Sequence, residues 1–149
     1  MAVSNGINPS FESVKITNTA QGDSVLRVAK AVYNFAIDGG AVSTITPNGT
    51  VALPDNAVII AATVNSTTAV TSSGAATVSI GTSAGSSATS ILGATAKASL
   101  SADAVLNGVP VFATPVKLTA AGNVTFTIGT AALTAGVIEV TLYYTVALA

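Results

Sequence analysis

The sequence predicts an all-β protein, an antiparallel two-sheet sandwich of jelly-roll type with an extended N-terminal arm. Segments of strand length, with period-two alternation of apolar and polar residues, recur along most of the chain. Turns rich in Gly, Asn and Pro separate them. The one stretch with near-helical spacing, residues 88–106, contains Gly93 and several Ser and Thr residues, so we expect a crossover loop with about one helical turn there. Roughly eight short strands joined by turns fit two stacked sheets.

The first 24 residues differ from the rest of the chain. Turn signals border one short alternating stretch, residues 11–17, in which Val14 and Ile16 share a face. This pattern suits either an extended arm carrying one short strand or an ordinary edge strand of the domain. If it is an arm, Phe11, Val14 and Ile16 are the side chains expected to anchor it to a neighbouring subunit or to another partner protein. The predicted domains are therefore an arm, residues 1–24, and a sandwich, residues 25–149.

Within the sandwich, strand patterns follow one another at residues 25–37, 41–46, 58–64, 75–80, 124–128 and 137–146. The first pattern places Tyr33, Phe35 and Ile37 on one face and ends at the turn Asp38-Gly39-Gly40. The last gives the strongest single signal, since its alternation continues over ten residues. Its apolar face consists of Ile138, Val140, Leu142, Tyr144 and Val146.

Tyr143 is expected to point outward from the last strand. Adjacent residues of a strand face opposite sides of the sheet, and Tyr144 belongs to the apolar face. An outward tyrosine can anchor a protein interface or stack on a sugar. It can also fill a cross-strand pair, which is the commoner arrangement.

One short pattern occurs twice in the chain. Residues 71–82 and 119–130 both read T-x-x-G-x-x-T-x-x-I-G-T. Two copies are too few for a solenoid, which needs at least about three repeats. We therefore expect a pair of equivalent strands, one in each half of the sandwich.

The composition argues against an enzyme. The chain has no histidine, cysteine or tryptophan, so a Ser-His-Asp triad and thiolate metal sites are excluded. Its six carboxylates are scattered, and Asp23, Asp38, Asp55 and Asp103 fall in predicted turns or loops, where aspartate accepts hydrogen bonds from backbone N–H groups. Loops 38–40 and 54–56 are the only ones that could contribute to a calcium site, and plain turns explain both. We expect no catalytic, cofactor or metal residues.

Charge and hydropathy point to self-association. The five basic residues are dispersed, which predicts no nucleic-acid partner. Mean hydropathy is +0.69, a value more usual for membrane proteins, yet no run approaches the ~18 apolar residues of a span. The first residues also lack the basic and apolar regions of a signal peptide. We therefore expect a homo-oligomer, with apolar surface buried between copies that a net charge of −1 does little to keep apart.

The sequence resembles small virion proteins of tailed bacteriophages over roughly residues 33–147. The segments that carry the resemblance are 38–42, 53–60, 73–78 and 131–136 followed by the closing strand. Proteins of this kind include capsid decoration, or cement, proteins, which are typically β-sandwiches or barrels that sit as trimers on the outside of the head. The resemblance thus implies a virion protein on the capsid exterior, with the major capsid protein as partner.

Two other roles remain open at this point. The same sandwich could be a receptor- or glycan-binding module of a phage fibre or spike, with Tyr143 at a shallow site. It could also be a tail or neck component of the particle. A glycan binder should present an aromatic-lined groove away from subunit contacts, but most aromatic residues of this chain are expected to be buried.

Overall fold

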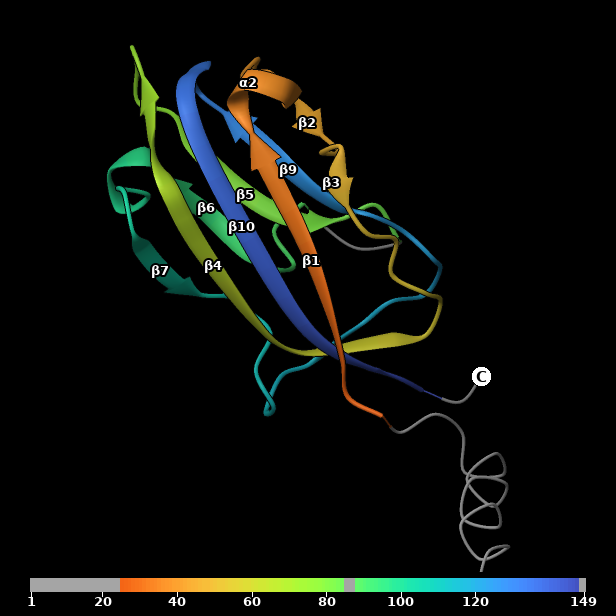
Figure 1. Ribbon diagram of the computed structural model, residues 1–149. Coiled ribbons are helices and arrows are strands. Elements are labelled where there is room, and N and C mark those ends of the chain that lie inside the picture. The colour runs from red at the N-terminus through yellow and green to blue at the C-terminus, as the bar shows by residue number, and fades with distance from the viewer. Residues whose placement is uncertain (1–24, 85–87, 148–149) are drawn as a thin grey trace, which may run out of the picture.

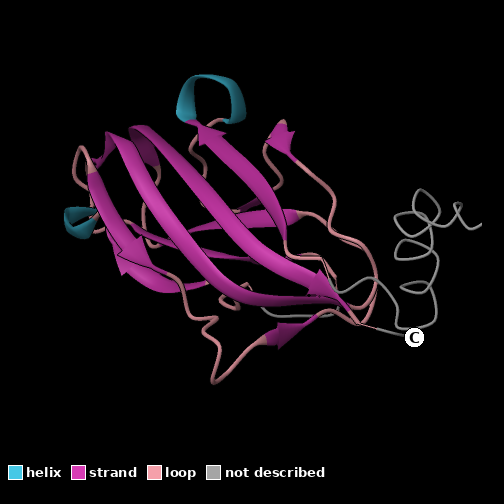
Figure 2. Ribbon diagram, turned by 60° about the horizontal axis from the view of Figure 1, so that its bottom comes forward, coloured by secondary structure: helices cyan, strands magenta, loops and turns pink. Residues whose placement is uncertain are grey.

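Two antiparallel β-sheets, packed face to face, make up the protein (Figure 1). The computed structural model describes residues 25–84 and 88–147, so the predicted arm lies outside the described residues. Figure 2 shows two layers of strands with short helices at their margins. The predicted all-β, two-sheet sandwich is confirmed.

The two sheets differ in size. The larger has the order β3-β1-β10-β4-β7, and β8 also pairs with β4. Its strands are β1 (Arg27–Asn34), β3 (Gly49–Thr50), β4 (Ala57–Ser72), β7 (Ala104–Asn107), β8 (Val116–Lys117) and β10 (Leu133–Val146). The smaller has the order β2-β9-β5-β6, with strands β2 (Thr44–Ile45), β5 (Thr77–Thr82), β6 (Leu92–Ala96) and β9 (Val124–Gly129).

The chain passes repeatedly from one sheet to the other. Without the two-residue strands β3 and β8, the larger sheet reads β1-β10-β4-β7 and the smaller reads β2-β9-β5-β6. Only β5 and β6 are then consecutive strands that pair directly. Eight strands interleaved between two sheets in this way are compatible with the predicted jelly-roll type.

The core lies between the sheets and is almost entirely apolar. Tyr33 of β1 and Phe126 of β9 stack across it, with ring centroids 5.5 Å apart. The alternation predicted for the last strand is confirmed, because Ile138, Val140 and Leu142 are fully buried. The remaining large, fully buried side chains come from both sheets and their connections: Leu53, Ile59, Val64, Ile80, Ile91, Leu100, Leu118 and Ile128.

The strand expected over residues 25–37 ends earlier than its apolar pattern suggests. After Asn34 the chain turns into a single-turn helix, α2 (Phe35–Asp38), and Ile37 is 65% exposed. The Asn34 side chain accepts a hydrogen bond from the Ala36 N–H, an N-cap. The Asp38 carboxylate accepts one from the Asn34 N–H at 2.9 Å. These local hydrogen bonds to the backbone end the strand in spite of its apolar period.

Residues 88–106, expected to form a crossover loop, hold two strands. β6 pairs with β5, β7 begins at Ala104 and pairs with β4, and the 3₁₀-helix η2 (Lys97–Ser99) lies between them. Each adds to the edge of an existing strand, where unpaired backbone groups are available. The expected helical turn is present as η2, but cross-strand hydrogen bonds determine the structure of β6 and β7 on either side of it. Strand β4 also continues to Ser72, well beyond the predicted end at residue 64.

The two copies of the repeated pattern are direct neighbours in one sheet, not equivalents in opposite halves of the sandwich. β5 and β9 pair antiparallel, with Thr77 opposite Gly129 and Gly81 opposite Thr125. The middle threonine of each copy therefore faces the second glycine of the other copy. A Cβ atom on Gly129 would lie only 2.8 Å from Thr77 Oγ1, so the pairing favours glycine at this position.

Candidate interaction surface

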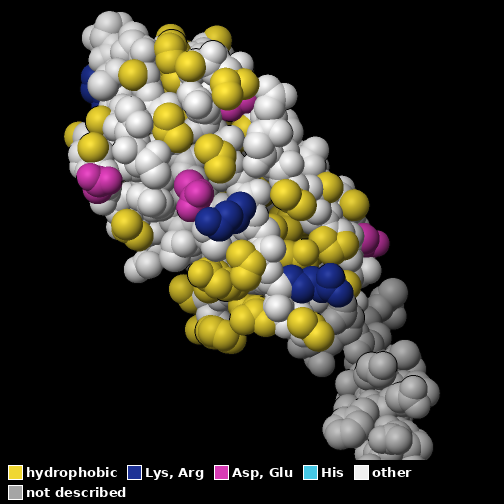
Figure 3. Space-filling view, in the orientation of Figure 1, with side chains coloured by type: hydrophobic (Ala, Val, Ile, Leu, Met, Phe, Trp, Pro, Cys, Tyr) yellow, Lys and Arg dark blue, Asp and Glu magenta, His cyan; other side chains and the backbone are white. Residues whose placement is uncertain are grey.

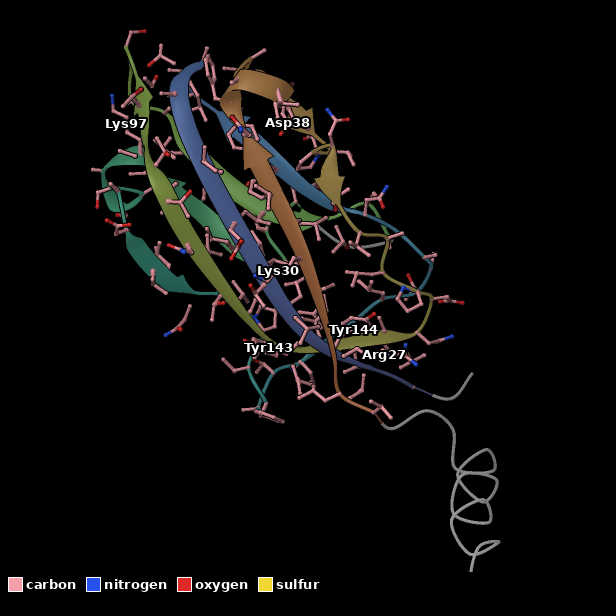
Figure 4. All side chains as sticks on the ribbon, viewed as in Figure 1. Arg27, Lys30, Asp38, Lys97, Tyr143 and Tyr144 are labelled. Carbon is pink, nitrogen blue, oxygen red and sulfur yellow. The ribbon has the colours of Figure 1, made fainter. Side chains whose placement is uncertain are left out.

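Tyr143 lies on the outer face of the larger sheet, as predicted, at the end where β1 begins and β10 ends (Figure 4). Val28 of β1 is its partner on one side and Ala61 of β4 on the other. Tyr143 is half-buried, whereas Val28 is 56% exposed. The three side chains form an apolar row across the three central strands.

A β-bulge widens this row. The register of β4 and β10 shifts between Tyr143 and Tyr144, which pair with Ala61 and Ile59, so that Ile60 is the additional residue. Ile60 and Ala61 are both half-buried. Leu26, just before β1, is 54% exposed. We call Leu26, Val28, Ile60, Ala61 and Tyr143 together the Tyr143 surface.

A second apolar feature, which sequence reasoning missed, projects beside this surface. Phe112 was expected among mostly buried aromatics, yet it is 80% exposed. It sits at the tip of a tight turn in which the Thr114 N–H donates to the Val111 carbonyl at 2.9 Å. Pro110 and Pro115 flank the turn, and a proline ring fixes φ, so the tip is largely preorganised. Residues 109–115 are called the Phe112 turn.

Gly108 holds the start of this turn against the body of the protein. Its N–H donates to the Ala62 carbonyl at 2.8 Å, and the Val109 N–H donates to the Ile91 carbonyl at 2.7 Å. A Cβ atom on Gly108 would lie 2.5 Å from the Ala62 Cβ and 2.8 Å from the Ile91 carbonyl oxygen. Only glycine fits this close approach, which fixes where the turn leaves the sheet.

The space-filling view shows how these features combine (Figure 3). Hydrophobic side chains gather over the lower part of this face, over β1, β10, β4 and the loop below them. Lys30 and Glu139 border the gathering with an ion pair of 3.2 Å. The exposed large hydrophobic residues of the described chain are Val25, Leu26, Val28, Ile37, Val42, Val51, Val105, Val109, Val111 and Phe112. None of these belongs to a strand of the smaller sheet.

The polar groups of the structure serve the fold. Asp38, predicted to accept backbone hydrogen bonds, accepts them from the Asn34 and Asn48 N–H groups through its two oxygens, at 2.9 and 3.0 Å. The Tyr33 hydroxyl donates to the Gly39 carbonyl at 2.6 Å. Burial, and then the charge of Asp38, raises the pKa of Tyr33 to about 12. A neutral, buried phenol and a fully engaged carboxylate are structural groups here.

Within residues 25–84 and 88–147, no three His, Cys, Asp or Glu side chains gather where they could hold a metal ion. In the same part of the chain, no helix has the length and apolar character that a bilayer span requires. The expected anchors Phe11, Val14 and Ile16 lie outside the described residues. Tyr143 and the Phe112 turn are thus the described features with the character of an interaction surface.

This protein is similar in structure to known proteins, but the sequence comparisons found no match. No protein-family model matches the chain, and no curated protein is similar to it. A chain in the acidic stable capsid structure of Helicobacter pylori bacteriophage KHP30 matches with a TM-score of 0.59 at 16% identity, over 83% of this chain and 90% of that one. A chain of the cyanophage Pam1 capsid asymmetric unit matches with a TM-score of 0.61 at 16% identity, over 85% and 88%.

A third match comes from the capsid of Ralstonia phage GP4, with a TM-score of 0.52 at 16% identity, over 83% of this chain and 86% of that one. The shared part therefore spans nearly the whole of each neighbour as well as most of this protein. At this level of identity the likeness is one of fold. The protein has the β-sandwich fold found in chains of these three phage capsid structures.

Proposed function

We propose that this protein is a structural component of a bacteriophage virion, a decoration or cement protein that binds the outside of the head and stabilises the shell. The observation that carries the proposal is its fold, which it shares with chains of three phage capsid structures over most of their length. The absence of histidine and cysteine from the sequence supports a structural, non-enzymatic role.

The physical task of such a protein is to add contacts that the shell must break before it ruptures. Each contact can be weak, because many copies on one lattice act together. A two-sheet sandwich with a continuous apolar core resists deformation and so transmits load between its contacts. The major capsid protein is the proposed partner.

The Phe112 turn is the proposed capsid anchor. An aromatic side chain that is 80% exposed, on a turn flanked by two prolines, loses little conformational freedom on binding. Aromatic side chains that become buried when two proteins bind typically contribute most of the binding free energy of an interface. The neighbouring Val109 and Val111 are also exposed and would enlarge the apolar contact.

Purified protein added to capsids that lack it would test the proposal. Bound copies per capsid and the temperature of shell rupture are the measurements, and both should rise with added protein. Phe112→Ser should lower affinity about tenfold or more, since hot-spot truncations remove ~2 kcal/mol or more. Ala96→Ser, on exposed β6 of the smaller sheet, is the matched control and should bind normally.

Two results would overturn the assignment. If the protein binds no shell but binds host cells or their glycans, it is a receptor-binding module, in which Tyr143 and Phe112 would stack on sugars. If it binds no shell but localises to the tail or neck of the particle, it belongs to another part of the virion. Equal capsid binding by the wild type and Phe112→Ser would remove the turn from the contact while leaving the decoration role intact.

A further inference from the structure

We propose that residues 11–17 of one copy dock on the Tyr143 surface of a neighbouring copy. The inference deepens the proposed function and rests on it, because capsid decoration proteins, which this chain resembles, are typically trimers. A closed ring of three copies requires heterologous contacts, in which two different surfaces of each chain are complementary. The arm and the Tyr143 surface would be such a pair.

The position of the Tyr143 surface supports this pairing. It begins at Leu26, only nine residues after Thr17, where the segment ends. A fully extended chain spans at most ~3.3–3.6 Å per residue, so the eight steps from Thr17 to Val25 reach about 28 Å. That length allows the segment to lie on a neighbouring copy whose Tyr143 surface comes within about 28 Å of Val25.

The chemistry of the two surfaces also matches. Phe11, Val14 and Ile16 are apolar, and so are all the members of the Tyr143 surface. The segment carries one acid and one base, Glu12 and Lys15, and the Tyr143 surface is bordered by the pair Lys30 and Glu139. Opposite charges at the rim of an apolar contact set its register more than its strength.

Self-association of this kind meets little electrostatic resistance. The formal net charge of each chain is −1, so copies repel one another only weakly. Val28 and Leu26 are more than half exposed in the single copy. Covering them with an arm would bury apolar surface at roughly 25 cal/mol per Å² before the entropy of ordering the segment is subtracted.

Cross-linking tests the inference cleanly, because the chain has no cysteine of its own. Ser13→Cys would be introduced in one population and Ala61→Cys in a second that carries a larger tag, and the two would be co-expressed. A short bis-maleimide reagent should then give a covalent dimer of unequal chains. Ala96→Cys, exposed on β6 of the smaller sheet, replaces Ala61→Cys in the control and should give little dimer.

Tyr143→Ser, added to the Ala61→Cys chain, should lower the yield of the covalent dimer about tenfold, which corresponds to ~1.4 kcal/mol of contact free energy. Far-UV circular dichroism and the melting temperature would show whether this chain still folds. If Ala61→Cys itself fails to fold, Ile60→Cys at the bulge provides a second attachment point in the same surface.

Two outcomes would overturn the inference. A single chain with both Ser13→Cys and Ala61→Cys that cross-links only within itself would place the arm on its own sheet. The absence of any cross-link to residues 60 and 61 would remove the arm from this surface. These cross-linking experiments contain no capsids. A negative cross-linking result would therefore not count against capsid binding through the Phe112 turn. Equally, a failure to bind capsids would not change how the cross-linking result is interpreted.

Discussion

The outer faces of the two sheets differ sharply, although both sheets share one core. The larger sheet exposes Val28 and Val105 and adjoins the Phe112 turn, whereas no strand of the smaller sheet contributes an exposed large hydrophobic residue within the described chain. Hydroxyl pairs occur on both sheets, as between Thr44 Oγ1 and Thr127 Oγ1 at 2.9 Å on the smaller one and between Thr71 Oγ1 and Thr134 Oγ1 at 2.8 Å on the larger one, so the difference lies in the exposed apolar side chains. Part of the apolar content behind the high mean hydropathy therefore lies outside the core, around the larger sheet.

A protein with few charges can thus concentrate its exposed apolar side chains around one of its two sheets. Hydroxyl side chains on the smaller sheet can hydrogen-bond to solvent and to each other, and they offer little apolar area to a partner. Apolar side chains gathered on the other face have the character of a proposed interaction site. The comparison predicts that substitutions at the core weaken both sheets together, while those on the larger sheet's outer face change assembly more than stability.

The largest expected effect is at the junction of the two sheets. Phe126→Ala should remove about 3–5 kcal/mol of unfolding free energy, because Phe126 is fully buried and stacks on Tyr33. For a chain of this size the melting temperature should fall by roughly 6–20 °C. Calorimetry should show one transition, and two separate transitions would contradict a core shared by both sheets.

Thr127→Ala, the next residue of the same strand, is the matched control. Its side chain hydrogen-bonds to Thr44 on the exposed side of the sheet. The loss should stay near ~1 kcal/mol, the usual net value of one hydrogen bond. A loss as large as that of Phe126→Ala would mean that the smaller sheet's outer face is itself a packed interface.

The second effect is a dependence on alkaline pH. The pKa of Tyr33 is raised from 10.0 to about 12, so the folded state holds the phenolic proton more tightly than the unfolded state does. The associated stability is fully present below pH 10 and is lost as the pH rises from 10 to about 12. It amounts to at most about 3 kcal/mol. Denaturant unfolding across this pH range would measure it.

Tyr33→Phe should flatten this alkaline loss, since phenylalanine has no proton to release. The variant also lacks the hydrogen bond to the Gly39 carbonyl, so it should be ~1 kcal/mol less stable at neutral pH. The two stabilities should therefore converge as the pH rises above 10 and then cross, with the wild type less stable than the variant near pH 12. An unchanged alkaline loss in the variant would assign the titration to other groups.

The third effect concerns the glycine that positions the Phe112 turn. Gly108→Ala should cost about 1–3 kcal/mol, because the new Cβ would overlap the Ala62 Cβ and the Ile91 carbonyl oxygen. Gly93→Ala is the control, since a Cβ there meets nothing within 4 Å. The melting temperature should fall only for Gly108→Ala, and capsid occupancy should fall with it. Equal melting temperatures would show that the turn is not held at Gly108.

The smallest expected effect is at the charged border of the Tyr143 surface. Lys30→Ala and Glu139→Ala should each change stability by no more than ~1 kcal/mol, as is typical for exposed ion pairs. A double-mutant cycle would measure the coupling between them. A coupling well above that value would show that the pair is desolvated, as it would be under a docked partner.

The sequence predicted the strands in which the alternation of apolar and polar residues matches the alternation of buried and exposed positions. β10 was foreseen, with Tyr143 outward, because alternation over a long strand records which side chains reach the core. The early end of β1 was not, since it depends on Asp38, whose second oxygen accepts from the Asn48 N–H ten residues away. β6 and β7 were also missed, because edge strands are stabilised by the backbone of their neighbours and not by a pattern of their own.

For the Tyr143 surface, too, the sequence predicted one part and the tertiary structure determined the rest. Tyr143 was predicted from its own strand, but its apolar partners Val28 and Ala61 are brought beside it from strands far apart in the chain. Phe112 was overlooked, because hydrophobicity alone suggests burial, and the two prolines that flank the turn were the available signal.

Composition and strand periodicity were enough to predict a β-sandwich of low charge with more apolar surface than its core needs. Periodicity and composition are local properties, and the sequence displays them directly. Where the apolar excess lies was decided by strand pairing, register and the bulge at Ile60, which are contacts between distant residues. The lack of histidine and cysteine can be read from the residue types, while the Tyr143 surface brings its members together only once the sheets have formed.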